Sequence, residues 1–297
     1  MDIRTTSNPV IRWAGRRLHA LNARHPWDHN AHFHRWILRS LPAGRSRMLD
    51  VGCGRGDLVR ALAATGARVD GIDPDPGMAL AAAERCRDLA GVTIRRRGLA
   101  EHAALLRPEH PGGLYDALTM VASLHHMDLE SALADARDLL RPGGRLLVVT
   151  LTVPRTATDT LWDIGNALTN PLIGLAEHPR PVRDPVPGPT IPVRDPAWSV
   201  GELRERAREV LPGAVLHRRE GFRATLRWQK PDREGKPGWG PPVREPISRA
   251  RAQARCAAMT SPSRATASSI TAGEWVTKLS RIVERSAWSA KNDQPGR

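Results

Sequence analysis

The chain has 297 residues, of which 40% are hydrophobic, and a formal net charge of +14. This length accommodates one α/β domain with additions, and the sequence contains no apolar run of about 18 residues that would predict a transmembrane helix. Three scattered cysteines favour a reducing, cytoplasmic compartment over a disulfide framework, and we expect no association with membranes.

The chain begins with a basic leader, residues 1–26, which contains five arginines and no apolar stretch of the kind found in secretory signals. A short helix is predicted over residues 13–22. The segment 27–34 then contains three histidines and two aromatic residues, Trp27 and Phe33. In structural terms this segment predicts a helix start, with Asp28 or Asn30 as the N-cap and both aromatic side chains in the core.

The most informative pattern lies just beyond this segment. Residues 48–51 predict a short apolar strand, three alternate glycines from Gly52 to Gly56 predict an unobstructed turn, and residues 57–62 predict a helix. A strand, a glycine turn and a helix N-terminus form the nucleotide-binding corner of a doubly wound α/β sheet. A second acid, Asp73, ends the next apolar segment, about 20 residues beyond the turn, where a carboxylate can hold ribose hydroxyls.

The charges around this turn indicate which nucleotide it binds. The third glycine comes one residue earlier than in the dinucleotide fingerprint, and Asp57 stands where that fingerprint has Gly or Ala. Asp50 and Asp57 would oppose a pyrophosphate at the helix N-terminus, and they suit a cation instead. S-adenosylmethionine carries an ammonium and a sulfonium and no phosphate, so it fits better than NAD. A dinucleotide-binding oxidoreductase and a non-catalytic nucleotide-binding module remain as alternatives from a different class.

The second half of the domain is less regular. The segment 151–198 begins with a helix-compatible stretch at residues 161–168 and becomes rich in proline, which predicts an extended loop across the edge of the sheet. A capping-box pattern then starts a helix over residues 199–210. Strands are predicted at residues 215–218 and 223–228, and they complete the sheet.

The tail, residues 230–297, has a different composition. It is rich in Pro, Gly, Arg, Ser and Ala, and we expect it to be mostly disordered, with one amphipathic helix over residues 275–283. It contains 13 Lys and Arg against 6 Asp and Glu, which gives half of the excess positive charge of the chain. Binding to nucleic acid is considered and not favoured, because an aromatic content of 4% is poor for base stacking.

Four segments resemble, in the correct order, the motifs of the class I S-adenosylmethionine-dependent methyltransferases, in particular the branch that acts on small molecules. The resemblance covers about residues 27–229. It implies a Rossmann-like, doubly wound seven-stranded sheet with a C-terminal antiparallel hairpin and an N-terminal helical cap, in which residues 151–198 form a lid over the substrate. The four segments are residues 48–56, 71–78, 115–127 and 140–149.

The resemblance also implies the residues that contact the methyl donor. Asp73 is the ribose acid. Leu99 stands where members of the family often have an Asp that contacts the adenine amino group, so backbone groups or Glu101 must take over this contact. The implied cofactor-binding residues are Asp50, Gly52, Cys53, Gly54, Gly56, Asp73, Pro74, Ala100, Glu101, Val121 and His32.

Methyl transfer from a sulfonium is an in-line displacement, and its main requirements are alignment of the reactants and exclusion of water. A general base helps when the acceptor is a hydroxyl or an ammonium. The candidates for this base are His125 and His126, which follow the fourth strand, and His34, because in similar enzymes the segment 27–34 covers the donor and lines the acceptor pocket. No metal is expected, since no zinc-binding His or Cys pattern accompanies these histidines.

The sequence also contains evidence on the chemical class of the methyl acceptor. Family members that methylate exocyclic amines of bases usually have an Asn/Asp-Pro-Pro-aromatic segment after the fourth strand, and this chain has residues 121–125, Val-Ala-Ser-Leu-His, instead. This difference favours a small-molecule acceptor, methylated at an O, N or C atom. An RNA or protein methyltransferase is the alternative that the basic charge suggests. The sequence does not predict the oligomeric state.

Overall fold

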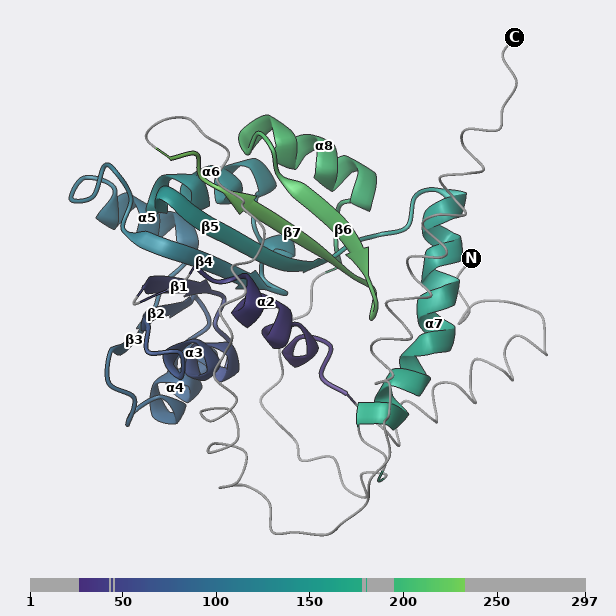
Figure 1. Cartoon of the computed structure of the whole chain (residues 1–297), viewed down its shortest axis with the longest axis horizontal. Helices are drawn as coiled ribbons and strands as arrows, with labels where there is room; N and C mark the ends of the chain where they lie inside the picture. Colours follow the sequence, from purple (N-terminus) through teal and green to yellow (C-terminus); the bar gives the residue numbers. More distant parts are fainter. Residues whose placement is uncertain (1–26, 43, 45, 178–179, 181–194, 233–297) are drawn as a thin grey trace.

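The computed structural model describes residues 27–42, 44, 46–177, 180 and 195–232 (Figure 1). The basic leader, most of the proline-rich segment and the tail beyond Asp232 lie outside the described residues. The helices predicted over residues 13–22 and 275–283 lie outside them as well.

One mixed sheet forms the centre of the domain (Figure 1). Its first five strands are parallel, and its last two form an antiparallel hairpin beside the fifth. The strands are β1 (Arg47–Val51), β2 (Arg68–Asp73), β3 (Val92–Arg96), β4 (Tyr115–Val121), β5 (Leu140–Leu151), β6 (Val215–Arg219) and β7 (Arg223–Gln229).

The strand order is β3-β2-β1-β4-β5-β7-β6. This order confirms the predicted doubly wound, seven-stranded sheet with a C-terminal hairpin. The chain moves outward from β1 to β3 and then returns to the other side of β1 at β4, so β1 and β4 flank the topological switch point where sheets of this kind bind ligands.

Helices cover both faces of the sheet, and each face has its own apolar core. The strands supply buried side chains to both cores, as parallel strands enclosed by helices do. One face carries the short 3-10 helix η1 (Ala31–Phe33) with α2 (His34–Ser40), α3 (Asp57–Ala63) and α4 (Pro76–Arg85), and the other carries α5 (Leu99–Leu106), α6 (Leu129–Leu139) and α8 (Val200–Val210).

The start of β5 differs from its predicted form. The sequence predicts a helix end and a glycine turn before the strand, whereas the structure includes residues 141–144 in β5 as an irregularity. Tyr115 pairs with Leu140 and Ala117 pairs with Arg145, so the extra residues bulge out of the ladder. Glycine is required here because a β-carbon at Gly144 would lie 3.0 Å from the carbonyl oxygen of Tyr115.

The helix α8 begins as predicted. The Ser199 hydroxyl accepts a hydrogen bond from the Glu202 backbone amide, and the Glu202 carboxylate accepts one from the Ser199 amide, so the capping box is complete. The apolar side of α8, with Val200 and Leu203, is buried against the sheet.

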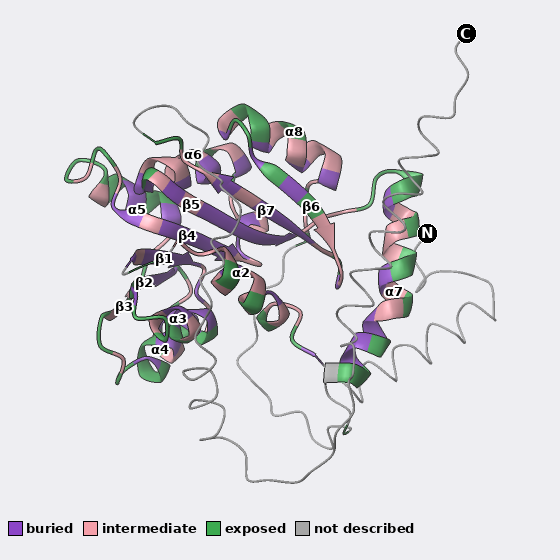
Figure 2. Cartoon of the chain, viewed as in Figure 1, coloured by how far each residue is buried: buried purple, intermediate pink, exposed green. Residues whose placement is uncertain are grey.

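The helix α7 (Ala157–Glu177) includes the predicted stretch 161–168 and extends beyond it at both ends, through Pro171. The proline-rich run from Pro179 to Pro196, for which the sequence predicts an extended loop, lies mostly outside the described residues. Helix α7 stands beside the sheet rather than on one of its faces (Figure 1). Its amphipathic pattern is inverted (Figure 2): the polar residues Asp159, Asn166 and Asn170 are buried. The large apolar side chains that it exposes are Leu161, Ile164, Leu168, Leu172 and Leu175.

No helix in the described part of the chain is both long enough and apolar enough to cross a membrane.

Candidate functional site

The predicted donor site lies at the carboxyl edge of the sheet, the edge at which the parallel strands end. The glycine turn follows β1, Asp73 ends β2, and the 3-10 helix η2 (Leu124–His126) follows β4. Because β1 has β2 on one side and β4 on the other, these three segments meet at the switch point.

The glycine turn has a backbone that only glycine adopts easily. Gly52, Gly54 and Gly56 have φ angles of 70°, 53° and 82°, in the left-handed region. A β-carbon at Gly52 would lie 2.4 Å from the β-carbon of Ser123, so the turn and the loop after β4 are in close contact. A β-carbon at Gly54 would meet no described atom within 4 Å, so this residue borders open space.

Asp73 joins this turn to the end of β2. Its Oδ2 accepts a hydrogen bond of 2.9 Å from the Gly54 amide, and its Oδ1 accepts one of 2.9 Å from the Asp75 amide. Burial raises the pKa of Asp73, while these bonds and the nearby His126 oppose the rise. Each carboxylate oxygen keeps a second lone pair, which leaves acceptor capacity for a ribose diol.

Asp50 lies behind the turn. Its side chain is only 2% exposed, and its Oδ1 accepts a hydrogen bond of 2.7 Å from the Thr119 hydroxyl. Burial, reinforced by the negative charge of Asp73, raises the pKa of Asp50 to about 7. Asp50 therefore supports the turn from within the sheet, and its charge depends on pH near neutrality.

We predict that Asp50→Asn makes the stability of the fold less dependent on pH. The native carboxyl holds its proton up to about pH 7, whereas in the unfolded chain it loses the proton near its ordinary pKa of 3.8. The native state thus binds more protons, and the free energy of unfolding falls with rising pH over this window, by at most about 1.4 kcal/mol per unit. Between pH 5 and pH 8 the wild type should lose about 2–3 kcal/mol that the Asn variant keeps.

Urea unfolding of both proteins at pH 5 and pH 8 measures this difference. An equal pH dependence in the two proteins would mean that Asp50 is already ionised in the native state at pH 5.

The other predicted cofactor residues lie around the same corner. Pro74 is exposed just beyond β2, and Val121 ends β4 with partial exposure. Cys53 is buried, and burial raises the pKa of its thiol, so the residue contributes its backbone amide, which donates to the Ile72 carbonyl oxygen at 3.0 Å. At the start of α5, Ala100 and Glu101 are exposed, while the Leu99 side chain packs in the core.

The histidines after β4 lie close to the donor corner. His125 and His126 are half-buried in η2, with ring centroids 4.2 Å apart. His126 is near enough to Asp73 to lower the pKa of that carboxyl. The Ser123 hydroxyl donates a hydrogen bond of 2.7 Å to the Val51 carbonyl oxygen, which fixes this loop against the end of β1.

The segment 27–34 is a capped helix start, as one of its two interpretations predicts. The Asp28 carboxylate accepts hydrogen bonds from the amides of Asn30 and Ala31, and Trp27 and Phe33 are buried. His34 begins α2, where burial lowers its pKa and the charges of Asp28 and Asp57 oppose this effect. A neutral His34 retains the lone pair that a base requires.

The same segment also contacts distant parts of the chain. His32 Nε2 lies 3.0 Å from Glu220 Oε1, in the turn between β6 and β7. Trp27 Nε1 and His29 Nε2 lie 3.1 Å and 2.8 Å from Asn170 Oδ1 on α7. Residues 27–34, α7 and the β6–β7 turn are thus joined, and we call these three segments the cover.

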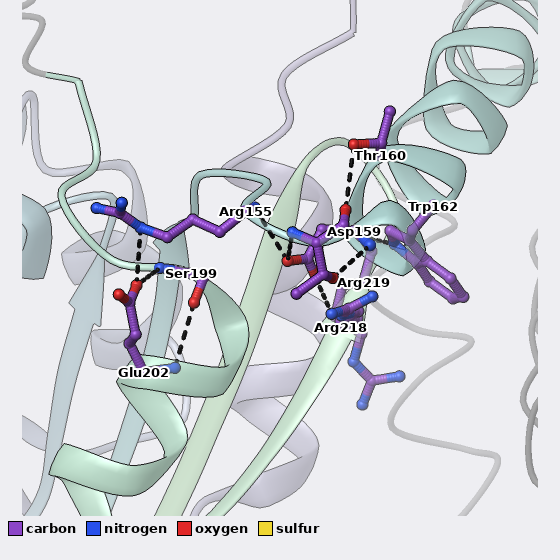
Figure 3. Close-up of polar contacts among 9 residues, drawn as sticks. Arg155, Asp159, Thr160, Trp162, Ser199, Glu202, Arg218 and Arg219 are labelled. Atoms are coloured by element: carbon purple, nitrogen blue, oxygen red, sulfur yellow. Dashed lines mark hydrogen bonds and ion pairs between the residues drawn. The ribbon is translucent and has the colours of Figure 1, made fainter. Parts of the chain in front are cut away.

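A pocket lies under the cover, between α7 and the ends of β5, β6 and β7. Figure 3 shows its polar contacts: the Asp159 carboxylate binds Arg218, and Trp162 Nε1 lies 3.4 Å from the Arg219 carbonyl oxygen. The sequence does not predict these contacts, because no local pattern marks a contact between residues about 60 positions apart. The lining residues are Thr152, Val153, Pro154, Asp159, Trp162, Asp163, Asn166, Val200, Arg218, Phe222 and Arg223.

Comparison with known proteins decides the family. A family model described as a methyltransferase domain matches residues 49–146. An uncharacterized methyltransferase of Mycobacterium tuberculosis is 32% identical over 211 residues, which are 69% of this chain and 98% of the relative. The chain belongs to the class I S-adenosylmethionine-dependent methyltransferases.

Two further relatives of this methyltransferase act in quinone biosynthesis according to their names. The demethylmenaquinone methyltransferase of Tropheryma whipplei is 36% identical over 129 residues, which cover 42% of this chain and 51% of the relative. The ubiquinone biosynthesis O-methyltransferase of Xylella fastidiosa is 37% identical over 118 residues, which cover 39% of this chain and 46% of the relative. The chain therefore spans about half the length of these two relatives.

The donor corner of the methyltransferase fits S-adenosylmethionine. Gly54 leaves space where a side chain would otherwise stand, and Asp73 combines a fixed position with free acceptor capacity. Asp73, and Asp50 where it is ionised, add negative potential that suits a cationic donor. Among the described residues, no group of three His, Cys, Asp or Glu side chains is placed to hold a metal ion.

Proposed function

We propose that this methyltransferase transfers a methyl group to a small-molecule acceptor. The observation that carries the proposal is the cover: contacts from residues 27–34 to Asn170 and Glu220 join three segments beside the ends of β5, β6 and β7, where we place the acceptor. A closed cover suits a small molecule better than an RNA or protein chain. The names of the quinone-methylating relatives provide independent support for a small-molecule acceptor.

In this proposal, bound S-adenosylmethionine supplies an activated methyl group, and the residues of the chain align the reactants. Asp73 accepts hydrogen bonds from the ribose, and the Gly52–Gly56 turn holds the rest of the donor against its backbone. His125 or His126 removes a proton from an acceptor hydroxyl or ammonium, and His34 is the third candidate for this base. The cover excludes water from the site.

A labelling experiment tests the proposal. The protein is incubated with S-adenosylmethionine that is labelled in its methyl group and with fractionated cell extract, and small molecules, RNA and protein are then separated. We expect the label in the small-molecule fraction. Label confined to RNA or to protein would replace the proposal with the alternative that the basic charge of the chain suggests.

The domain boundaries at residues 27 and 229 remain part of the proposal. Lys230 still contacts the domain: its Nζ donates hydrogen bonds of 2.9 Å and 2.7 Å to the carbonyl oxygens of Arg137 and Leu140. A truncation that tests the tail should therefore end at Asp232.

The proposed cytoplasmic location rests on the low number of cysteines in the chain. Two of them, Cys53 and Cys86, are buried free thiols.

We predict that truncation after Asp232 preserves both the melting temperature and the affinity for S-adenosylhomocysteine. All seven strands and the whole donor corner precede this residue. Residues 233–297 contain 12 Lys and Arg against 5 Asp and Glu, so truncation removes a net charge of +7. Non-specific retention of RNA should accordingly fall and become less sensitive to salt, as a filter-binding assay at several salt concentrations can measure.

Two outcomes would contradict this prediction. A melting temperature lowered by many degrees would mean that the tail packs on the domain. Unchanged RNA binding would place the basic surface on the domain and favour the RNA methyltransferase.

A further inference from the structure

The pocket under the cover contains two arginine side chains in different electrostatic environments. Arg218 is neutralised, because its guanidinium binds the buried Asp159 carboxylate. Arg223 begins β7 opposite Leu151, the last residue of β5, so it stands at the carboxyl edge of the sheet. Both arginines line the pocket, and only Arg218 has an acidic partner there.

The bonds of Arg223 use only part of its donor capacity. Its Nη1 donates to the Gly221 carbonyl oxygen at 3.1 Å, and its Nη2 donates to Asn30 Oδ1 at 3.2 Å. Its Nε is buried and has no hydrogen-bond partner among the described residues. The Nε is closed off by surrounding protein atoms, whereas each Nη carries two N–H groups, so one hydrogen on each Nη remains for a ligand.

The positive charge of Arg223 is not balanced by an ion pair in the described part of the chain. Burial lowers the pKa of Arg223, and the charge of Asp28 opposes this effect without forming an ion pair. Asp163 also lines the pocket, but it forms no ion pair with Arg223 among the described contacts. A buried cation without a partner is costly, and an anion that enters the pocket relieves this cost.

We propose that this pocket is the acceptor site and that Arg223 binds a carboxylate of the acceptor. The inference rests on the proposed function and adds the chemical class of the substrate. The remaining Nη hydrogens of the guanidinium can donate charge-assisted hydrogen bonds to the oxygens of a carboxylate. The uncharged remainder of the acceptor lies against Trp162 and Val153.

The sheet geometry also limits the shape of such an acceptor. The glycine turn follows β1, while Arg223 lies on β7, three positions away in the order β1-β4-β5-β7. Neighbouring strands are about 4.8 Å apart, so the backbones that carry the glycine turn and Arg223 are separated by about 14 Å along the sheet. An acceptor whose carboxylate lies at Arg223 must span part of this distance to bring its methylated atom to the donor.

Ligand-observed NMR titrations test this assignment. The probes are benzoate with benzamide and propionate with propionamide, each added to the full chain saturated with S-adenosylhomocysteine. The proteins are the wild type, Arg223→Gln, Arg223→Lys and the control Arg227→Gln, which changes another arginine of β7 that does not line the pocket. The affinity for S-adenosylhomocysteine and the melting temperature of each protein are measured in parallel.

We expect the wild type and Arg227→Gln to bind at least one carboxylate about tenfold more tightly than its amide. Arg223→Gln should lose this preference, and Arg223→Lys should retain part of it. Equal affinity for acid and amide in the wild type would overturn this inference but not the proposed function. An unchanged preference in a folded Arg223→Gln protein would do the same. Failure of the wild type to bind S-adenosylhomocysteine would instead contradict the proposed function.

Discussion

Replacement of Asp73 by alanine is expected to weaken the binding of S-adenosylhomocysteine by about one to three orders of magnitude. The wild-type carboxylate is held by the amides of Gly54 and Asp75 and keeps a lone pair on each oxygen for the ribose diol. Each charge-assisted bond contributes about 1.5–3 kcal/mol, and water recovers part of this when the side chain is removed. Isothermal titration calorimetry measures the change.

Asp70 provides a matched control on the same strand. It is as deeply buried as Asp73, but it binds Arg47, Arg95 and Tyr115, none of which belongs to the donor corner. Asp70→Asn should lower the melting temperature and leave the affinity for S-adenosylhomocysteine unchanged. Wild-type affinity in a folded Asp73→Ala protein would remove Asp73 from the donor site.

Gly54→Val is expected to abolish donor binding while the sheet remains folded. The new side chain would project into the open space in front of the turn, where the donor is proposed to lie. The valine backbone would also be strained, because the φ angle at this position is 53°. This backbone cost is about 1–2 kcal/mol, which lowers stability without unfolding the domain. Binding of S-adenosylhomocysteine and circular dichroism of the same sample separate the two effects.

Gly52 should respond differently to substitution. Its β-carbon would collide with Ser123 at 2.4 Å, so even Gly52→Ala should destabilise the junction between β1 and β4. A Gly54→Val protein that binds the donor normally would show that the glycine turn is not the cofactor site.

The local parts of the structure could be predicted from the sequence, because their signals lie within a few residues of one another. The strand and glycine turn at residues 48–56 are of this kind, and so is the capping box that begins with Ser199. The motifs also predicted the seven-stranded sheet, because they indicate the order in which strands and helices follow one another. The predicted hairpin, β6 with β7, is confirmed to within one residue.

The cover and its pocket could not be predicted in the same way. Arg223 meets Asn30 across 193 residues of chain, and Trp27 meets Asn170 across 143. No period or spacing in a single sequence connects such positions. The full length of α7 was not predicted either, because it contains Pro171, a residue type that normally ends a helix. The roles of the predicted site residues toward the donor and the acceptor stay predictions.

The inverted helix α7 has a consequence for the motions of the molecule. A helix that buries leucines is held by an interaction that depends little on direction. The helix α7 buries Ile173 and is otherwise joined to other segments through Asp159, which binds Arg218, and Asn170, which contacts Trp27 and His29. Because α7 buries few large apolar side chains, opening this helix alone should cost less free energy than unfolding the sheet. Amide hydrogen exchange should therefore be much faster in α7 than in β4, and an acceptor can enter the pocket through local opening of this one helix.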